Sequence, residues 1–180
     1  MYINDWIAKF SDTTENQIKA IFSTLFIATN KLQTLFDNHI PEISLKQFML
    51  LSIVRQSQEP LTFTQLGHLS GCSRQNIKKL AAALQKKGFI TIQQSPQDTR
   101  AMCICPTKKA DSFFQHDFAK YQKELKYLFE VYTDKEIETL FLLLSKLYAG
   151  IGHLEQKTAS EADHPAMETT NRQKQGGNNK

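Results

Sequence analysis

Hydrogen-bonding and cationic side chains gather in a short segment between residues 73 and 79. Arg74 and Gln75 fall in the first turn of a predicted helix, the part of a recognition helix that meets base edges in the major groove of DNA. Lys78 and Lys79 lie further along, where ammonium groups are better placed for phosphates. An ordinary solvated helix face is the alternative interpretation, so the neighbouring elements must decide between the two.

The residues before this segment predict a helix, a turn and then the second helix. Thr62 can cap the first helix because Gln65 follows three residues later, which is a capping-box arrangement. Gly71 permits a turn that a residue with a Cβ atom resists, and Ser73 is the next N-cap. This order predicts a helix-turn-helix and favours the DNA-reading interpretation.

Apolar spacing gives each of these helices a side to bury. On the first helix the predicted core residues are Phe63, Leu66 and Leu69. On the second they form a stripe of Ile77, Leu80, Ala81 and Leu84. Gly88 is expected to end this helix as a C′ glycine, with Lys86 and Lys87 in the last turn, where cations suit the helix dipole.

After Gly88 the apolar period changes to that of strands. Residues 89–92 and 101–105 form two runs separated by turn-forming residues 95–98, which predicts a two-stranded hairpin, or wing. At its tip the Asp98 carboxylate can reach the Arg100 guanidinium or nearby backbone donors and stiffen the loop. Arg100 would then be presented to the minor groove, whose negative potential favours arginine. An ordinary surface pair is the alternative.

These motifs resemble the MarR family of multiple-antibiotic-resistance-type transcriptional regulators, over roughly residues 14–154. The most specific part is Leu84-Gln85-Lys86-Lys87-Gly88-Phe89-Ile90, followed by Asp98-Thr99-Arg100 and Pro106-Thr107. The resemblance implies a winged helix-turn-helix whose first and last helices interlock two subunits. The chain departs from the family pattern at Ile92 and Gln93, where arginine is frequent, at Pro106 in place of leucine, and at Ala110 in place of glycine.

Helical segments flank the module on both sides. A long helix is expected from Thr14 to Asp37, beginning at Asp12 with Glu15 three residues on, and its apolar band is wide enough to pack against a partner chain. Ser44 with Gln47 predicts the start of a second helix, and residues 108–129 predict a third. Thr133 with Glu136 predicts the start of a last helix that runs to about His153.

The predicted fold class is mainly α with a small β-hairpin wing, a winged helix-turn-helix domain plus N- and C-terminal dimerisation helices. We expect a single domain over residues 1–155, with the winged helix-turn-helix core at 61–107 and dimerisation helices at 12–38 and 108–154. Residues 156–180 lose the apolar period and are expected to form a disordered tail.

Charge is distributed unevenly along the chain. Its 180 residues carry a net charge of +4, whereas residues 55–110 hold nine lysines and arginines against two carboxylates, a net +7. A basic block within a slightly acidic remainder is typical of nucleic-acid binding. No stretch is expected to span a membrane and no signal peptide is recognisable, so we expect a cytoplasmic protein without membrane association.

Catalytic chemistry finds little support. The five histidines are scattered, with no zinc-protease spacing, phosphate-binding loop or nucleophile elbow, so we expect no enzyme activity, no cofactor and no bound metal. His39, Glu42 and His116 would approach a zinc site only if the fold brought them together, and exposed histidines are the alternative.

The three cysteines predict no disulfide framework. Cys72 is expected to be buried beside the turn, and Cys103 and Cys105 to share one side of a strand. The resemblance implies that relatives which sense oxidants usually do so through a cysteine in the first helix region, which this chain lacks.

Together these features predict a sequence-specific transcriptional regulator, a ligand-responsive repressor that acts as a homodimer on a palindromic operator in double-stranded DNA. The predicted DNA contacts are Thr62, Ser73, Arg74, Gln75, Asn76, Lys78, Lys79 and Arg100, with Asp98 stabilising the wing. The expected effector is a small apolar or aromatic acid, with candidate pocket walls at Phe22, Phe26 and Phe48, which also suit a plain core. Two alternatives are a metal- or thiol-responsive sensor on the same fold and a winged-helix protein-interaction module that does not bind DNA.

Overall fold

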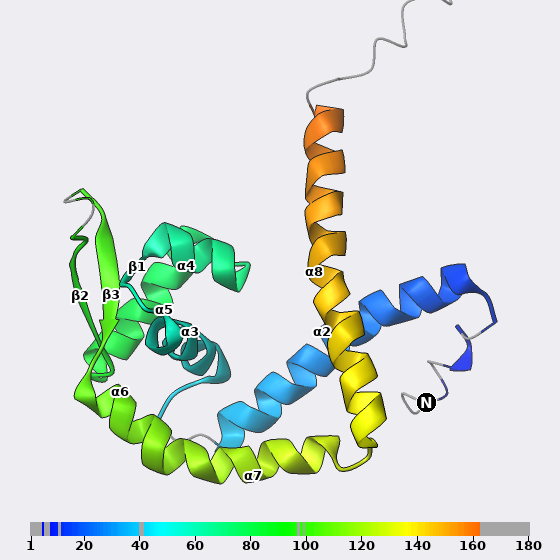
Figure 1. The fold of residues 1–180 in the computed structure, drawn as a ribbon, viewed down its shortest axis with the longest axis horizontal. Coiled ribbons are helices and arrows are strands. Elements are labelled where there is room, and N and C mark those ends of the chain that lie inside the picture. Colours follow the sequence, from blue (N-terminus) through cyan, green and yellow to red (C-terminus); the bar gives the residue numbers. More distant parts are fainter. Residues whose placement is uncertain are drawn as a thin grey trace, which may run out of the picture. The chain divides into compact units, whose positions relative to one another are not determined.

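The computed structural model describes residues 5, 8–10, 12–39, 42–96, 98 and 100–162. The chain divides into two compact units, residues 1–119 and residues 120–180. The first contains α2 (Thr14–His39), α3 (Leu45–Gln56), β1 (Leu61–Thr62), α4 (Phe63–Ser70), α5 (Arg74–Lys86), β2 (Ile90–Gln94), β3 (Met102–Pro106), α6 (Lys108–Ser112) and η1 (Phe113–Asp117) (Figure 1). Helix α7 (Phe118–Phe129) begins in the first unit and ends in the second, which also contains α8 (Asp134–Ala162). This division differs from the single domain expected over residues 1–155, because none of the described residues of α8 is buried in the core.

The helix starts follow the capping residues of the sequence. The predicted capping boxes at Ser44 with Gln47 and at Thr62 with Gln65 are both present. Helix α2 is the exception: the amide of Asn16 donates to Thr13 Oγ1 at 3.2 Å, so Thr13 caps the helix in place of the predicted Asp12. These side chains satisfy backbone N–H groups that have no acceptor within the helix.

The end of α5 is fixed by a Schellman motif. Lys87 is the C-cap, Gly88 at C′ has φ +78°, and Phe89 at C″ is buried. The Gly88 amide donates to Gln85 O at 2.9 Å and the Phe89 amide to Leu84 O at 3.0 Å. This confirms the predicted C′ glycine, since the left-handed backbone favours a residue without Cβ. The turn before α5 likewise has Gly71 at φ +61°.

The wing is part of a three-stranded antiparallel sheet with the order β1-β3-β2. In the hairpin Ile92 lies opposite Ile104, and β1 adds the pairs Leu61 with Ile104 and Thr62 with Cys103. The sequence predicted the hairpin but not β1, because a strand of two residues has no readable period. Pairing with β1 fixes the start of α4 against the wing.

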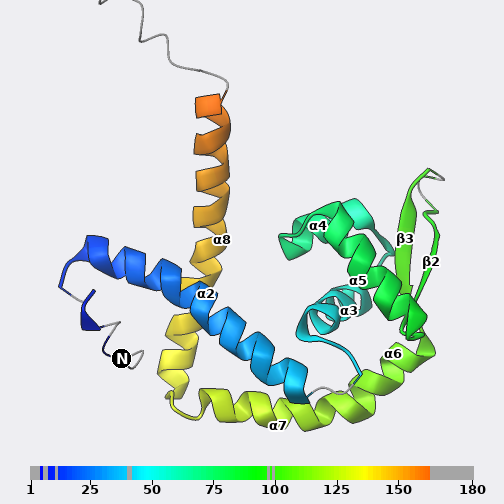
Figure 2. The ribbon, with the colours of Figure 1, turned by 180° about the vertical axis from the view of Figure 1, so that it is seen from behind.

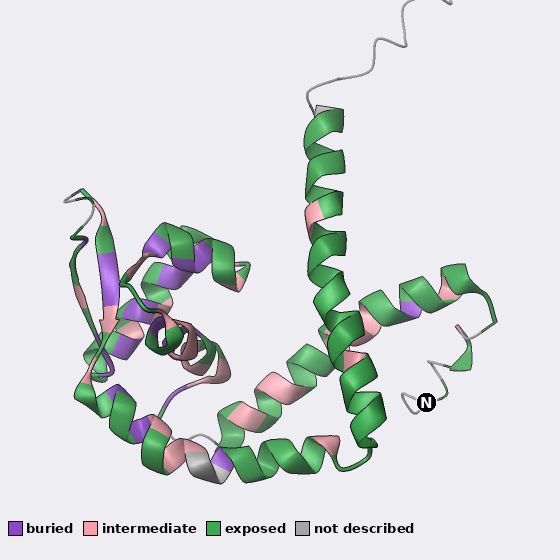
Figure 3. Cartoon of the chain, in the orientation of Figure 1, coloured by how far each residue is buried: buried purple, intermediate pink, exposed green. Residues whose placement is uncertain are grey.

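The core lies between α3, α4, α5 and the sheet. Its side chains with 0% to 2% exposure are Leu50, Leu51, Leu66, Ile77, Ala81, Leu84, Phe89, Ile90, Cys103, Ile104 and Ala110, together with Ile43 before α3. Figure 3 shows this concentration of buried residues, and Figure 2 shows the same helices from behind. Leu69, predicted to join the core, is instead 63% exposed, near the C-terminal end of α4. The stripe predicted on α5 is confirmed, since Ile77, Ala81 and Leu84 are buried and Leu80 is half-buried.

After the wing, the helix predicted over residues 108–129 is present but interrupted. Residues 113–117 form the π-helical turn η1 between α6 and α7. Phe113 is buried there and its ring meets Phe89 edge-on, with 5.5 Å between centroids. A π turn has no period that the sequence analysis could recognise.

In the second unit α8 begins at the predicted capping pair and ends later than expected. The amide of Thr133 donates to Glu136 Oε2 at 2.8 Å, and the amide of Glu136 donates to Thr133 Oγ1 at 3.3 Å. The helix continues to Ala162, so residues 156–162 are helical and were wrongly assigned to a disordered tail. Residues 163–180 of that predicted tail lie outside the described residues.

Helix α8 is also long and apolar enough over Asp134–Glu161 to cross a membrane. The expectation that no stretch is long and apolar enough to span a membrane was therefore wrong. Glu138 and Lys146 interrupt the apolar residues of α8, but the helix remains apolar on average. Helices that soluble proteins cover by packing can have the same length and composition.

Candidate nucleic-acid interface

Helix α5 presents two chemically different sides. Ile77, Ala81 and Leu84 are completely buried against the core. The opposite side is exposed and carries five of the predicted DNA-binding residues: Arg74, Gln75, Asn76, Lys78 and Lys79. Because 3.6 residues complete one turn, burying the apolar stripe forces this set outward together. Ser73 caps the helix by accepting from the Asn76 amide at 3.2 Å, so its hydroxyl holds the first turn that displays Arg74.

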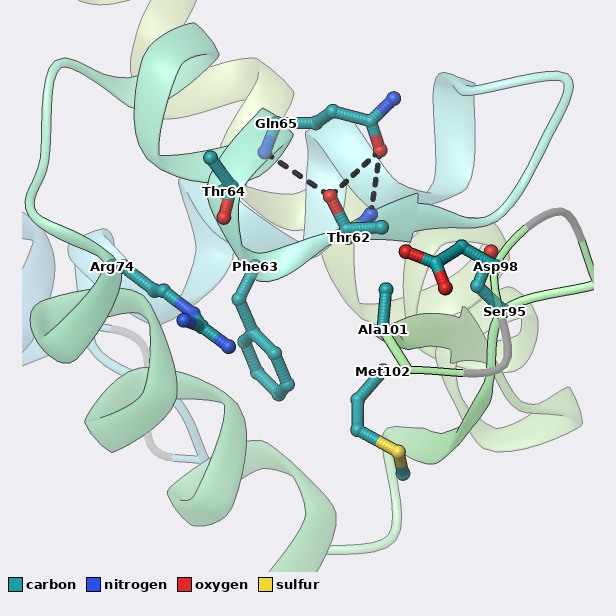
Figure 4. Close-up of a pocket in the computed structure, with 9 residues that line it drawn as sticks. All are labelled: Thr62, Phe63, Thr64, Gln65, Arg74, Ser95, Asp98, Ala101 and Met102. Atoms are coloured by element: carbon teal, nitrogen blue, oxygen red, sulfur yellow. Dashed lines mark hydrogen bonds between the residues drawn. The ribbon is translucent and has the colours of Figure 1, made fainter.

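A recess lies beside the first turns of α4 and α5 and the tip of the wing. It has a volume of about 290 Å³ and is lined by Thr62, Phe63, Thr64, Gln65, Arg74, Ser95, Asp98, Ala101 and Met102. Arg74 and Asp98 lie on opposite sides of it (Figure 4). Thr62 is occupied as a cap, since its amide and hydroxyl both donate to Gln65 Oε1, at 2.8 and 2.9 Å. The recess thus joins predicted DNA contacts from two helices with the predicted wing stabiliser.

The wing tip is held by backbone and carboxylate contacts. Asp98 Oδ1 accepts from the Arg100 amide at 2.9 Å, which is one of the two predicted ways for this carboxylate to stiffen the loop. The Ala101 amide donates to Asp98 O at 2.9 Å, and the Ser95 amide donates to Ala101 O at 2.8 Å. The Arg100 side chain is left exposed at the tip.

Two lysines of the basic block bind residues that are distant in the sequence. Lys87 Nζ donates to Glu42 O at 2.7 Å and to Gln47 Oε1 at 3.0 Å. Lys109 Nζ pairs with Glu42 Oε2 at 3.0 Å and lies 4.4 Å from the centroid of the Phe89 ring. The sequence identifies Lys87 only as a helix-dipole cation and Lys109 only as part of the basic block, because partners 40 or more residues away leave no local signal.

The three aromatic residues proposed as ligand walls fall into two groups. The rings of Phe22 and Phe26 on α2 meet edge-on with 5.0 Å between their centroids, and the two residues are 63% and 59% exposed. Phe48 of α3 instead stacks on Phe118, with 4.9 Å between ring centroids, and contacts Phe114, with 5.6 Å between centroids. Among the described residues no ring contact joins the two groups, so their shared role stays a prediction.

The metal and thiol alternatives receive no geometric support within the described residues. No group of three or more His, Cys, Asp and Glu side chains there is placed to hold a metal ion. His39 Nδ1 is hydrogen-bonded to Leu35 O at 2.7 Å, and Glu42 pairs with Lys109. Cys72, expected to be buried, is only half-buried. Burial, and secondarily the neighbouring Cys105, raises the pKa of the Cys103 thiol and so lowers its reactivity.

Comparison with known proteins gives one consistent result. The family model described as the MarR family matches residues 43–102. YpoP of Bacillus subtilis (strain 168), an uncharacterized HTH-type transcriptional regulator, is 29% identical over 133 residues, which are 74% of this chain and 89% of that protein.

Two solved structures share the fold. A probable transcriptional regulator from Pseudomonas aeruginosa has 24% identity and a TM-score of 0.63, covering 75% of this chain and 99% of that one. Sco3205, a MarR family transcriptional regulator from Streptomyces coelicolor solved in complex with DNA, has 17% identity and a TM-score of 0.67. The match covers 77% of this chain and 92% of that one. All three proteins are described as transcriptional regulators, the one from Pseudomonas aeruginosa as a probable one.

Proposed function

We propose that this chain is a DNA-binding transcriptional regulator of the MarR family, whose model matches residues 43–102, and that it acts in the cytoplasm as a ligand-responsive, homodimeric repressor on a palindromic operator. The observation that carries the proposal is the exposed face of α5. Arg74 and Gln75 in its first turn would read base edges in the major groove, and Lys78 and Lys79 would contact phosphates. Ser73 and Asn76 would add backbone contacts from the same turn.

The recess beside α5 supports a further contact to the DNA backbone. The first turn of α4, at the positive end of the helix dipole, lines the recess, and Arg74 supplies a guanidinium. We place a phosphate there, beside Thr62. Asp98 opposes this with its own charge, which the Arg100 amide partly offsets. Arg100 would enter the minor groove next to it.

The homodimer is supported by apolar side chains left uncovered on α2 and α8. On α8 the spacing of the apolar positions alternates between three and four residues: Ile137, Leu140, Leu144, Leu147, Ile151 and Leu154. This is the seam that packs one helix against another. Covering apolar surface contributes about 25 cal/mol per Å², so a second copy would stabilise these helices substantially. Two copies would also match the symmetry of a palindrome.

The effector is supported by the family assignment and by exposed aromatic surface. Phe22 and Phe26 lie on α2 close to the apolar band proposed for the dimer. An aromatic acid bound beside them would change DNA affinity only by binding the DNA-competent and incompetent arrangements with different strength. Phe48 would form part of the same wall only if the effector reached α3.

Selection from a random duplex library tests the DNA-binding proposal. Enrichment should yield a two-fold symmetric sequence with half-sites about one helical turn apart. Arg74→Ala should weaken binding to it by about 1 to 3 kcal/mol per half-site and relax base choice at one position. Lys79→Ala should weaken all sequences alike and lower the salt slope by about one per half-site.

Two results would contradict the proposed DNA-binding role of α5. If the purified protein enriched no sequence above background, operator binding would be refuted. If a sequence were enriched but both variants bound it as the parent does, another surface would read the DNA.

A further inference from the structure

The C-terminal end of the recognition helix α5 is joined to the start of α3 by polar contacts that the DNA-reading face does not use. Lys87, the C-cap of α5, donates through Nζ to Glu42 O at 2.7 Å and to Gln47 Oε1 at 3.0 Å. Lys109 Nζ pairs with Glu42 Oε2 at 3.0 Å and donates to Lys87 O at 3.1 Å. Two ammonium groups therefore bracket Glu42, and one of them also satisfies a carbonyl at the helix end.

The same polar unit continues to the end of α2. Asp37 Oδ1, in the last turns of α2, accepts from the amide of Leu45, the first residue of α3, at 2.6 Å. Gln47 Oε1 closes the capping box of α3 by accepting from the Ser44 amide at 3.2 Å, while it also accepts from Lys87. These contacts therefore link α2, α3, α5 and α6. We name the set formed by Asp37, Glu42, Gln47, Lys87 and Lys109 the α2–α5 joint.

The joint is suited to positioning and contributes little to overall stability. Glu42 and Lys109 are each 49% exposed, and an exposed ion pair changes stability little. The contacts nonetheless fix where α5 ends relative to α2 and α3. Phe89 contributes as well, because Lys109 Nζ lies 4.4 Å from the centroid of its ring. A change in the last turn of α2 would therefore reach α5 through Asp37 and Gln47 without passing through the apolar core.

We infer that Lys87, Lys109 and Glu42 are positioning residues for the recognition helix, and that the α2–α5 joint transmits changes at α2 to α5. This inference rests on the proposed function, because it assigns a regulatory path to the proposed DNA-binding helix. It gives Lys87 and Lys109 a role different from that of Lys78 and Lys79, which would contact phosphates. It also gives an effector bound beside α2 a route to DNA affinity.

Salt dependence separates positioning from phosphate contact. Lys87→Met keeps the length of the side chain and removes its hydrogen bonds, and Lys86→Met removes the same charge one residue earlier on an exposed position. Both should change the salt slope equally. Lys87→Met should bind the selected operator about 2- to 30-fold more weakly than Lys86→Met at every salt concentration, because an exposed contact is lost in both half-sites. Equal affinities of the two variants would overturn the assignment.

Charge exchange tests Glu42 and Lys109 as a pair. Glu42→Lys and Lys109→Glu should each lower operator affinity, and the double variant, which has the net charge of the parent, should recover most of the loss. A purely electrostatic role would instead make Glu42→Lys bind DNA more tightly than the parent, because that substitution adds positive charge. If the two effects were additive, the pair would not position α5.

Hydrogen exchange tests transmission from α2. Asp37→Ala should increase amide exchange of Gly88 and Phe89 in the free protein, where Asp12→Ala, at the other end of α2, should not. Unchanged exchange in Asp37→Ala would refute the transmission. A parent protein that bound no operator would instead refute the proposed function, and the exchange experiment would still decide whether the joint couples α2 to α5.

Discussion

The wing offers a pair of substitutions that separates two opposing effects of one carboxylate. Asp98 Oδ1 pins the tip by accepting from the Arg100 amide at 2.9 Å, yet its negative charge faces the proposed DNA surface. Asp98→Asn and Asp98→Ala both remove the charge. Only the alanine variant removes the acceptor as well, because an asparagine side-chain oxygen can take the same position.

The magnitude follows from the contacts at the tip. Two backbone bonds, from Ala101 N to Asp98 O and from Ser95 N to Ala101 O, remain in both variants, so the hairpin should persist. Losing the third contact costs about 0.5 to 1.5 kcal/mol per wing. Across the two wings of a dimer this gives about 1 to 3 kcal/mol, or a difference of about 5- to 150-fold in Kd between asparagine and alanine variants.

Fluorescence anisotropy with the selected operator, over a series of salt concentrations, measures both effects. Asp98→Asn should bind more tightly than the parent at low salt, since repulsion of the phosphates is removed, and this gain should shrink as salt screens it. Asp98→Ala should bind more weakly than Asp98→Asn at all salt concentrations. If the two variants bound alike, pinning by Asp98 would have no part in DNA binding, and the reasoning would be refuted.

Three further outcomes follow from the structure. Gly88→Ala should lower the stability of the first unit by about 1 to 2 kcal/mol in urea unfolding, because φ is +78°, while Gly150→Ala should be neutral or stabilising; equal effects would contradict the backbone argument. Leu147→Glu on the proposed α8 seam should turn a dimer into a monomer in light scattering and abolish operator binding, and a dimeric variant would place the interface elsewhere. The backbone and side chain of Thr133 lower the pKa of Glu136 below its ordinary value of 4.5, so this cap should stabilise α8 above that pH and be lost as pH falls through the lower folded value. In an NMR titration Thr133→Ala should raise the pKa of Glu136 toward 4.5, and an unchanged titration would show that the cap does not form in solution.

The sequence by itself determined the features that depend on neighbours within a few residues. The capping boxes at Ser44, Thr62 and Thr133 and the C′ glycine at Gly88 are local hydrogen-bond and backbone arrangements, so their spacing was sufficient to predict them. The outward face of α5 was predictable for a related reason. The period of Ile77, Ala81 and Leu84 fixes which side is buried and therefore which side is free to carry Arg74.

The tertiary structure decided what depends on residues distant in the chain. The strand β1 exists only because β3 pairs with it, and Leu69 is exposed although its spacing from Leu66 predicted a buried residue. Lys86 and Lys87 are indistinguishable in the sequence, and both suit a helix C-terminus. Only the fold brings Glu42 and Gln47 to Lys87, because a hydrogen bond across 40 residues or more leaves no periodic trace between its partners.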